Sequence, residues 1–239
     1  MTSNDIKIKV FADGADLGGM LEMSREKYIS GFTTNPSLMK KAGVADYKTF
    51  AKEVLAKITE LPVSFEVFSD DFATMEKEAR EIGTWADNVY IKIPVVNSKG
   101  ESSVPLIKKL SGEGYRLNVT AVFTLDQVRE IVAAIKPGVG AYVSVFAGRI
   151  ADIGIDPLPI VTESARICSA VDGVECLWAS TREVFNIFEA QNAGCHIITV
   201  PNDILKKIPG LGKDINGMSL DTVQTFCKDI AALGYSVLS

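Results

Sequence analysis

The feature of this sequence that most constrains its fold is a regular alternation of short apolar runs with longer segments of helical pattern. The runs are rich in β-branched and aromatic residues, which indicates strands, and there are eight of them: Ile6–Ala12, Ile29–Thr33, Pro62–Phe68, Val89–Val95, Leu117–Phe123, Ala141–Phe146, Val174–Ala179 and His196–Val200. The segments between them space their apolar residues as helices do: Asp46–Thr59, Ala73–Trp85, Leu106–Glu113, Leu125–Ile135, Leu158–Ala170, Thr181–Ala193 and Asp203–Ile208. Strands that alternate with helices predict a parallel sheet. Eight such units of about 30 residues each favour an α/β fold of the (β/α)8 type, a TIM barrel.

The rest of the chain fits one domain with an additional C-terminal helix. A last helical segment, Leu220–Leu233, begins near Ser219 and ends at Gly234, and no linker-like stretch divides residues 1–239. A doubly wound open sheet is the main structural alternative. The chain has neither a G-x-G-x-x-G sequence after a strand nor a Walker P-loop, which disfavours a nucleotide-binding function.

Charge and hydropathy argue against two classes of partner. The net charge of −5 gives no basic footprint, so nucleic acid is not an expected partner. No apolar run approaches the roughly 20 residues that cross a bilayer, so no membrane partner is expected. The N-terminal segment Met1–Lys9 lacks the apolar core of a signal peptide. A cytoplasmic location is the expectation that follows.

The cysteine and histidine content gives no sign of a metal centre. The four cysteines are scattered without a C-x-x-C pair, and free buried thiols are their expected state: Cys168, Cys176, Cys195 and Cys227. The single histidine, His196, precedes an apolar strand and is better interpreted as a strand-edge residue than as a ligand or base. We therefore expect no metal site and no cofactor.

The apolar strand Asn88–Val95 contains one residue that does not suit a strand core, Lys92. Successive side chains of a strand point to opposite faces, so Ile91 and Ile93 share one face and Lys92 points to the other. In a central strand the amine would lie among apolar walls, where a lysine tends to lose its proton. A neutral amine is a nucleophile that can form a Schiff base with a carbonyl substrate. The alternative is an edge or terminal lysine whose amine reaches water.

Further residues that suit a pocket fall near the ends of the other predicted strands. In a (β/α)8 barrel the active site lies at the C-terminal ends of the strands. The residues at these positions are Asp13, Asn35, Glu66, Asn118, Thr120, Ser144, Phe146, Arg149, Ser180 and Arg182. Taken singly, an aspartate can cap a turn, an asparagine before proline can start one, and an arginine can lie on the solvated surface. Their coincidence around one lysine favours a pocket over a packed barrel core.

These side chains divide into three chemical groups. Two carboxylates can carry protons beside an amine, and these are Asp13 and Glu66. Four neutral groups suit hydroxyls and ordered water, namely Asn35, Asn118, Thr120 and Ser144. Guanidinium forks and a hydroxyl suited to phosphate or another oxyanion come from Arg149, Ser180 and Arg182. A polyhydroxylated ketone with an anionic end fits this set.

Five short segments carry a family resemblance. They are Gly31–Ser37 (GFTTNPS), Tyr90–Pro94 (YIKIP), Asn118–Ala121 (NVTA), Ser144–Ile150 (SVFAGRI) and Ala179–Arg182 (ASTR). In this order they resemble the motifs of the transaldolase family, and the second resembles the segment that holds the family's Schiff-base lysine. The resemblance extends from Asp13 to Pro201, nearly the whole chain.

The sequence departs from the family pattern at a few positions. Gly14 stands where many members have threonine, Val145 replaces a proline, and Thr181 replaces an aromatic residue. The chain length is closer to the small subfamily that includes fructose-6-phosphate aldolase. That aldolase branch typically has tyrosine and glutamine at two positions where this chain has Phe146 and Glu66. Both residues are the transaldolase choice.

The resemblance implies a class I transaldolase of carbohydrate metabolism, of the pentose phosphate pathway type. Lys92 would form an imine with the C2 carbonyl of a ketose phosphate, and Asp13 would accept the proton of the C4 hydroxyl. Glu66 and Thr120 would position a water for proton transfer. Substrate hydroxyls would be held by Asn35, Asn118 and Ser144, and the terminal phosphate by Arg149, Ser180 and Arg182. The implied partners are small-molecule sugar phosphates and further copies of the same chain in a homo-oligomer.

Three other functions remain open at this point. The first is a fructose-6-phosphate aldolase that releases free dihydroxyacetone, although Phe146 lacks the hydroxyl that would orient water and so favours transfer. The second is a sulfosugar transaldolase acting on 6-deoxy-6-sulfofructose, because the same clamp suits a sulfonate and Thr181 is unusual. The third, of another class, is a non-catalytic sugar-phosphate binding protein on the same fold.

Overall fold

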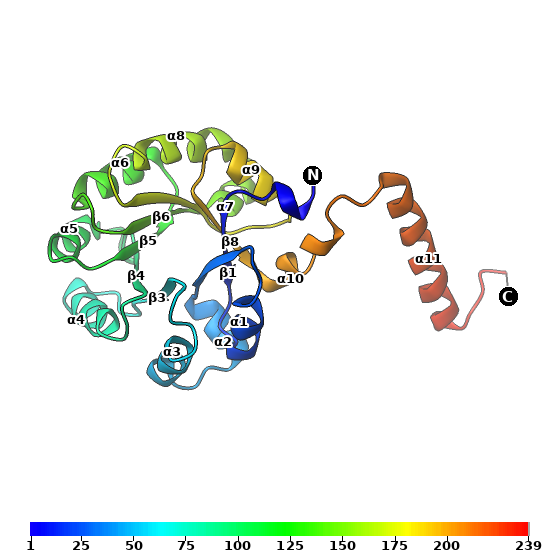
Figure 1. Ribbon diagram of the computed structural model, residues 1–239, viewed down its shortest axis with the longest axis horizontal. Coiled ribbons are helices and arrows are strands. Elements are labelled where there is room, and N and C mark those ends of the chain that lie inside the picture. Colours follow the sequence, from blue (N-terminus) through cyan, green and yellow to red (C-terminus); the bar gives the residue numbers. More distant parts are fainter. Residues whose placement is uncertain (239) are drawn as a thin grey trace.

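The strands of this protein form a closed parallel barrel. The structure is a computed structural model that describes residues 1–238, and within them eight strands pair in chain order, with β8 returning to β1 (Figure 1). The strands are β1 (Lys9–Asp13), β2 (Ile29–Thr33), β3 (Val63–Glu66), β4 (Val89–Pro94), β5 (Leu117–Val122), β6 (Ala141–Val145), β7 (Val174–Trp178) and β8 (Ile197–Pro201). This architecture confirms the predicted (β/α)8 fold. Most predicted strands were too long by one to three residues at an end, because the apolar runs continue into the turns.

Helices surround the barrel and connect its strands (Figure 1). They are α1 (Leu17–Met23), α2 (Pro36–Ala42), α3 (Tyr47–Leu55), α4 (Phe72–Gly83), α5 (Val104–Gly112), α6 (Leu125–Ala134), α7 (Ala147–Asp152), α8 (Leu158–Cys168), α9 (Asn186–Asn192) and α10 (Asn202–Leu205), with short 3₁₀ turns at Ser3–Asp5 and Ile208–Gly210. The sequence analysis missed α1, α2 and α7, since helices of six or seven residues are too short to show a period. The helix predicted from Thr181 begins only at Asn186. The residues before it form a loop at the mouth of the barrel.

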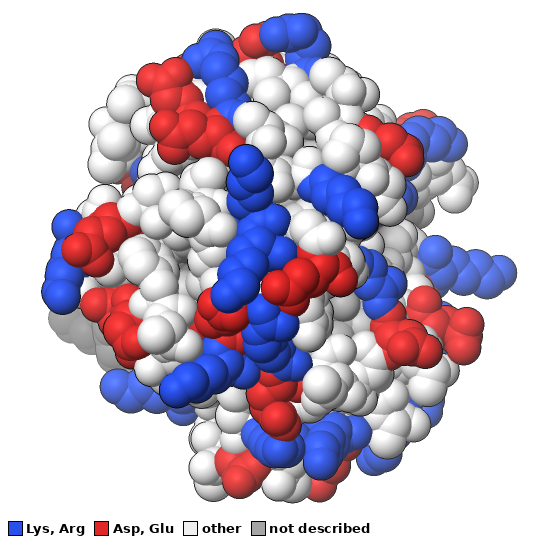
Figure 2. All heavy atoms as spheres, turned by 90° about the vertical axis from the view of Figure 1, so that its left-hand side faces the viewer, with Lys and Arg blue, Asp and Glu red and all other residues white. Residues whose placement is uncertain are grey.

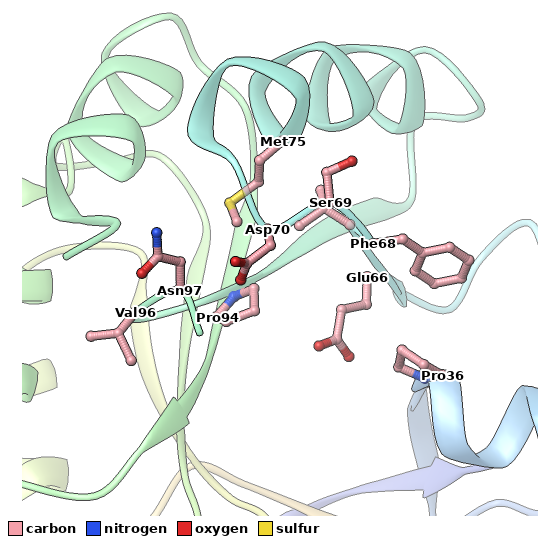
Figure 3. A pocket seen from close by; sticks show the side chains of 10 residues that line it. Pro36, Glu66, Phe68, Ser69, Asp70, Met75, Pro94, Val96 and Asn97 are labelled. Atoms are coloured by element: carbon pink, nitrogen blue, oxygen red, sulfur yellow. The ribbon is translucent and has the colours of Figure 1, made fainter. Parts of the chain in front are cut away.

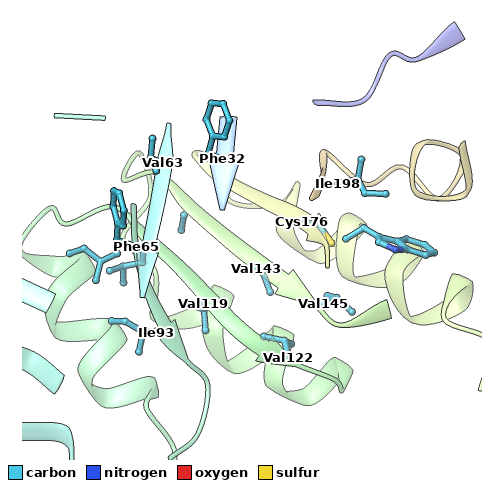
Figure 4. Close-up of a cluster of buried hydrophobic side chains, with 14 of the residues drawn as sticks. Phe32, Val63, Phe65, Ile93, Val119, Val122, Val143, Val145, Cys176 and Ile198 are labelled. Atoms are coloured by element: carbon cyan, nitrogen blue, oxygen red, sulfur yellow. The ribbon is translucent and has the colours of Figure 1, made fainter. Parts of the chain in front are cut away.

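The two faces of the strands bury different cores. Outward-facing side chains such as Phe32, Phe65 and Ile93 pack beneath the helices and are fully buried (Figure 4). Inside the barrel, a smaller cluster fills the N-terminal end, and Tyr90 stacks on Tyr142 there with ring centroids 4.0 Å apart. The alternation along β4 is the predicted one, because the isoleucines flanking Lys92 belong to the outer core. These aromatic side chains fill part of the barrel interior, and a cavity lies at the C-terminal ends of the strands.

The surface carries charges of both signs. Lys and Arg are interspersed with Asp and Glu on the face shown in Figure 2. Ion pairs link neighbouring helices: Arg80 on α4 contacts Glu76 and Glu113, and Lys109 on α5 reaches Glu76 at 2.7 Å. Within the described residues, none of the helices combines the length and apolarity that crossing a bilayer requires.

The C-terminal helix α11 (Ile215–Leu233) extends away from the barrel (Figure 1). It begins earlier than predicted, because Asp214 caps it by accepting a hydrogen bond from the Gly217 N–H at 2.9 Å. Every residue of α11 is exposed, including Cys227, so the expectation of a buried thiol is wrong at that position. The other three cysteines are buried as expected.

An apolar stripe runs along α11 and is left uncovered by residues 1–238. The stripe recurs every three or four residues and consists of Val223, Phe226, Ile230 and Leu233, each more than half exposed. The barrel in turn exposes large apolar side chains on the loops that follow β3, β6 and β7, namely Phe68, Ile153, Ile155 and Phe185. Uncovered apolar surfaces of this kind are typical of contacts with other protein chains, including further copies of the same chain.

We therefore expect self-association through α11, with the stripe of one copy on the barrel of another. Replacing Phe226 and Ile230 with glutamate should lower the molar mass measured by sedimentation equilibrium, because charges would have to be buried at the contact. The far-ultraviolet circular dichroism of the barrel should not change. Lys228→Glu, on the opposite side of α11, is the matched control. A wild-type mass equal to that of one chain would contradict the expectation.

Candidate active site

A cavity of about 400 Å³ opens at the C-terminal ends of the strands. All eight strands or the loops after them contribute to its wall. Ten of the eleven predicted site residues line it: Asp13, Asn35, Glu66, Lys92, Thr120, Ser144, Phe146, Arg149, Ser180 and Arg182. The eleventh, Asn118, is fully buried beneath the wall. Ten of the predicted residues thus share the lining of one cavity, and Asn118 is not part of that lining.

Lys92 lies in this cavity beside a carboxylate. Its Nζ is 3.0 Å from Glu66 Oε2 and donates a hydrogen bond to the Thr34 carbonyl oxygen at 3.0 Å. The parallel register of β3 and β4 places Glu66 directly opposite Lys92. The residue is only 7% exposed. The expectation of apolar walls around the amine is thus wrong, because Glu66 supplies both a counter-charge and a proton acceptor within hydrogen-bond distance.

Asp13 ends β1 and is held by two donors. Its Oδ1 accepts from Thr33 Oγ1 at 2.8 Å, and its Oδ2 accepts from Asn35 Nδ2 at 3.5 Å. Thr33 Oγ1 also contacts Thr199 Oγ1 at short range. Because the Thr33 hydroxyl donates to Asp13, Thr199 must donate to Thr33. Burial raises the pKa of Asp13, against the opposing effect of the Lys92 charge and these hydrogen bonds.

Asn35 caps a helix and also contacts the carboxylate of Asp13. Its Oδ1 accepts from the Leu38 N–H at 2.9 Å and so caps α2, in which Pro36 is the first residue. Its Nδ2 faces Asp13 across the cavity wall. The cap fixes the side chain that donates to the carboxylate.

A chain of hydrogen bonds lies beneath the cavity on β3, β5 and β6. Ser144 Oγ donates to Asn118 Oδ1 at 2.6 Å, and Asn118 Nδ2 donates to Ser64 Oγ at 2.9 Å. Asn118 therefore supports Ser144 from below and does not reach the cavity. Thr120 does reach it, and its Oγ1 is buried without a hydrogen-bond partner in the described part of the chain. Such a hydroxyl is available to a ligand or a water.

The cationic side of the cavity is built on β6 and β7. The Arg149 guanidinium lies 5.3 Å from the centroid of the Phe146 ring, and Arg182 forms an ion pair with Asp152 at the end of α7. Ser180 has a φ of 65°, unusual for a residue with a side chain. A Cβ on Gly148 would come within 1.6 Å of the Ser180 carbonyl oxygen, so only glycine fits there. This close approach brings helix α7, which carries Arg149, next to the loop after β7, which carries Arg182.

A second pocket of about 250 Å³ lies on the other side of Glu66 (Figure 3). It shares Pro36, Glu66 and Pro94 with the first cavity. Its polar lining includes the carboxylates of Glu66 and Asp70, and none of its described lining residues is basic. The second pocket is therefore less suited to an anion than the first cavity, whose lining includes two arginines.

Several residues that support the site were not predicted. Thr199 and Asp152 bond to Thr33 and Arg182, and Tyr47 donates its hydroxyl proton to the Glu66 carbonyl oxygen at 2.8 Å. Asp152 lies one helical turn after Arg149, a spacing that the sequence shows, whereas the tertiary contacts of Thr199 and Tyr47 leave no local signal. His196 lies outside the cavity, as expected: its Nδ1 accepts from the Cys176 N–H at 3.0 Å.

Metal ligands are not grouped in the described residues, where no set of three His, Cys, Asp or Glu side chains is arranged to hold an ion. The groups that converge on the cavity are an amine, two carboxylates, hydroxyls and two guanidiniums. They can form an imine, move protons beside it and bind an anion.

The comparison with known proteins agrees with this geometry. A family model described as Transaldolase/Fructose-6-phosphate aldolase matches residues 10–237. A protein named Probable transaldolase from Methanococcus maripaludis is 37% identical over 202 residues, covering 84% of this chain and 89% of that protein. A second of that name, from Sphingopyxis alaskensis, is 35% identical over 231 residues, covering 96% and 100%.

Among solved structures, KGPDC from Streptococcus mutans superposes with a TM-score of 0.55 at 12% identity, covering 84% of this chain and 92% of that one. That likeness shows the barrel fold alone. The family match and the sequence relatives establish an aldolase-type enzyme, and this chain belongs to the transaldolase/fructose-6-phosphate aldolase family.

Proposed function

We propose that this enzyme is a transaldolase. It transfers a dihydroxyacetone unit from a ketose phosphate, of the fructose 6-phosphate or sedoheptulose 7-phosphate type, to an aldose phosphate through an imine on Lys92. The observation that carries the proposal is the contact of 3.0 Å between Lys92 Nζ and Glu66 in a cavity that also holds Asp13. The amine, its proton acceptor and a second carboxylate are the groups that a Schiff-base aldolase needs.

Imine formation begins with proton transfer from the Lys92 ammonium to Glu66. The free amine attacks the C2 carbonyl carbon, and one proton passes from the nitrogen to the oxygen to give a hydroxyl. That hydroxyl leaves as water after Glu66 returns its proton to it. Thr120 stands ready to bond that water, because its buried hydroxyl has no partner within the described residues. The product is a protonated imine, whose positive nitrogen can take up an electron pair.

Cleavage of the C3–C4 bond uses the second carboxylate. Asp13 removes the proton from the C4 hydroxyl, the C3–C4 electron pair moves toward the iminium nitrogen, and an aldose phosphate leaves. The three-carbon enamine stays on Lys92. A second aldehyde phosphate then accepts it by the reverse steps, with Asp13 returning the proton to the new hydroxyl.

Substrate orientation follows from the charges of the cavity. The anionic end binds near Arg149 and Arg182, and Ser144 is positioned to bond a hydroxyl of the three-carbon unit. Phe146 presents a ring without a hydroxyl, so it offers no group to activate water against the enamine or imine. This favours transfer to an aldehyde over release of dihydroxyacetone.

The first test is covalent trapping. Reduction with borohydride in the presence of fructose 6-phosphate should attach a three-carbon unit to Lys92, identified by peptide mass spectrometry. Lys92→Arg keeps the charge opposite Glu66 but cannot form the imine, so trapping should vanish and transfer should fall by at least about 10⁴-fold. Lys99→Arg, an exposed lysine outside the cavity, is the control. Trapping on another lysine would refute the assignment, and rapid release of dihydroxyacetone without an acceptor would make the enzyme an aldolase.

The second test concerns Asp13 and pH. Asp13→Asn should reduce kcat by about 10²–10⁴-fold, the usual contribution of a general base. Because burial raises the pKa of Asp13 in the ligand-free protein, the acid limb of the wild-type kcat/KM profile, which reports groups of the free enzyme, should lie above the ordinary aspartate value of 3.8. The variant should lack that limb.

The same substitution should stabilise the protein at neutral pH. A raised folded-state pKa means that the folded chain holds the proton more tightly, so the Asp13 contribution to stability declines as pH rises from 3.8 through the folded-state value. At pH 7 the variant should melt higher by about 2–4 °C, the shift that roughly 1 kcal/mol produces in a domain of this size. The gain should shrink near pH 4. A variant that melts lower than wild type at pH 7 would show that the carboxylate is a net stabilising group.

A further inference from the structure

Arg182 is held at both ends before any ligand binds. Its backbone N–H donates to Asn186 Oδ1 at 2.9 Å. Its guanidinium is held by Asp152, with Nε donating to Oδ1 at 3.2 Å and Nη2 donating to Oδ2. Asp152 ends α7 and Arg182 follows β7, so this pair ties two neighbouring βα units together at the cationic side of the cavity.

Stability does not account for the pair. The side chains of Arg182 and Asp152 are 49% and 50% exposed, and ion pairs this open to solvent contribute little to folding. Hydrogen bonds from Arg182 lower the pKa of Asp152, and the charge of Arg149 lowers it further. Asp152 is therefore a carboxylate at any neutral or mildly acidic pH. It places a negative charge next to two arginines, at the point where an anion is expected to bind. A carboxylate at such a place needs an explanation in terms of function.

The geometry of the guanidinium supplies that reason. Arginine presents five N–H donors in a rigid plane. Asp152 occupies the edge formed by Nε and Nη2, which leaves Nη1 and the second hydrogen of Nη2 as a fork for one further oxyanion. A guanidinium whose orientation is fixed in advance loses less conformational freedom when the ligand binds.

From this arrangement we infer that Asp152 is a positioning residue, which orients Arg182 toward the anionic end of the sugar phosphate. The inference rests on the proposed function, because it takes a phosphorylated sugar as the ligand. The competing possibility is that Asp152 merely neutralises Arg182 and weakens anion binding. The two possibilities predict opposite changes in affinity for the phosphorylated donor. Removal of a positioning residue weakens binding of this donor, whereas removal of a competitor tightens it.

The test compares two donors that differ only in the phosphate. With fructose 6-phosphate, Asp152→Ala should raise KM about tenfold and leave kcat within about twofold, since the loss is one of orientation at a group remote from the reacting carbons. With unphosphorylated fructose, KM should not change. Asp152→Glu keeps a carboxylate and should restore part of the affinity. Asp126→Ala breaks a comparable exposed ion pair, with Arg129 on α6, and serves as the matched control.

A double-mutant cycle checks that Asp152 acts through Arg182. Asp152→Ala added to Arg182→Ala should raise KM no further, because the residue to be oriented is already gone. An unchanged or lower KM for fructose 6-phosphate in Asp152→Ala, or an equal rise for both donors, would overturn the inference. Borohydride trapping of dihydroxyacetone on Lys92 distinguishes failure of the proposed function from failure of the proposed role of Asp152. If the wild-type protein is not trapped, the proposed function is wrong. If the wild type and the Asp152 variants are all trapped while KM does not change, only the role of Asp152 is wrong.

Discussion

The contact between Lys92 and Glu66 is the interaction on which the rest of the site depends. It arises from strand register, because β3 and β4 align these two residues side by side on the inner face of the barrel. A buried amine without a partner would be costly, and so would a buried carboxylate. Together they tolerate burial, and the proton that one must lose in order to react has an acceptor 3.0 Å away. The fold thus brings together the proposed nucleophile and its proposed base by the same pairing that forms the sheet.

The charges of the cavity are arranged along its length. The deep end holds Asp13, Glu66 and Lys92, two carboxylates against one amine, whereas the outer end holds two arginines against Asp152. The deep end therefore repels a phosphate and the outer end attracts it. For the ketose phosphate that we propose as substrate, this field favours one orientation, with the carbonyl toward Lys92. Orientation is set by the sign of the charges before any individual hydrogen bond forms.

The sequence was sufficient to predict what depends on local pattern and on strand alternation. Apolar runs located the strands, and the parity of β4 placed Lys92 inside the barrel and its isoleucine neighbours outside. The burial of Asn118 could not be predicted in this way. Alternation along a strand predicts that a side chain faces inward, but it does not predict whether a neighbour such as Ser144 covers that side chain. Short helices such as α7 give no detectable period. The exposure of α11 depends on the absence of a packing surface within the described chain, which an amphipathic pattern cannot reveal.

The cationic side of the cavity shows why functional residues and packing cannot be separated here. Gly148 approaches the Ser180 carbonyl so closely that no side chain fits, and Ser180 adopts a left-handed conformation at that contact. Arg149 follows that glycine directly, and Arg182 stands two residues after that serine. The separation of the backbone at Arg149 and Arg182 is therefore set by a contact that involves neither arginine, and Asp152 then orients the guanidinium of Arg182. A ligand that contacts both arginines must therefore match a backbone spacing that is set by the β6–α7 and β7–α9 turns. These turns contribute to selectivity among anions at this site, together with the charged side chains.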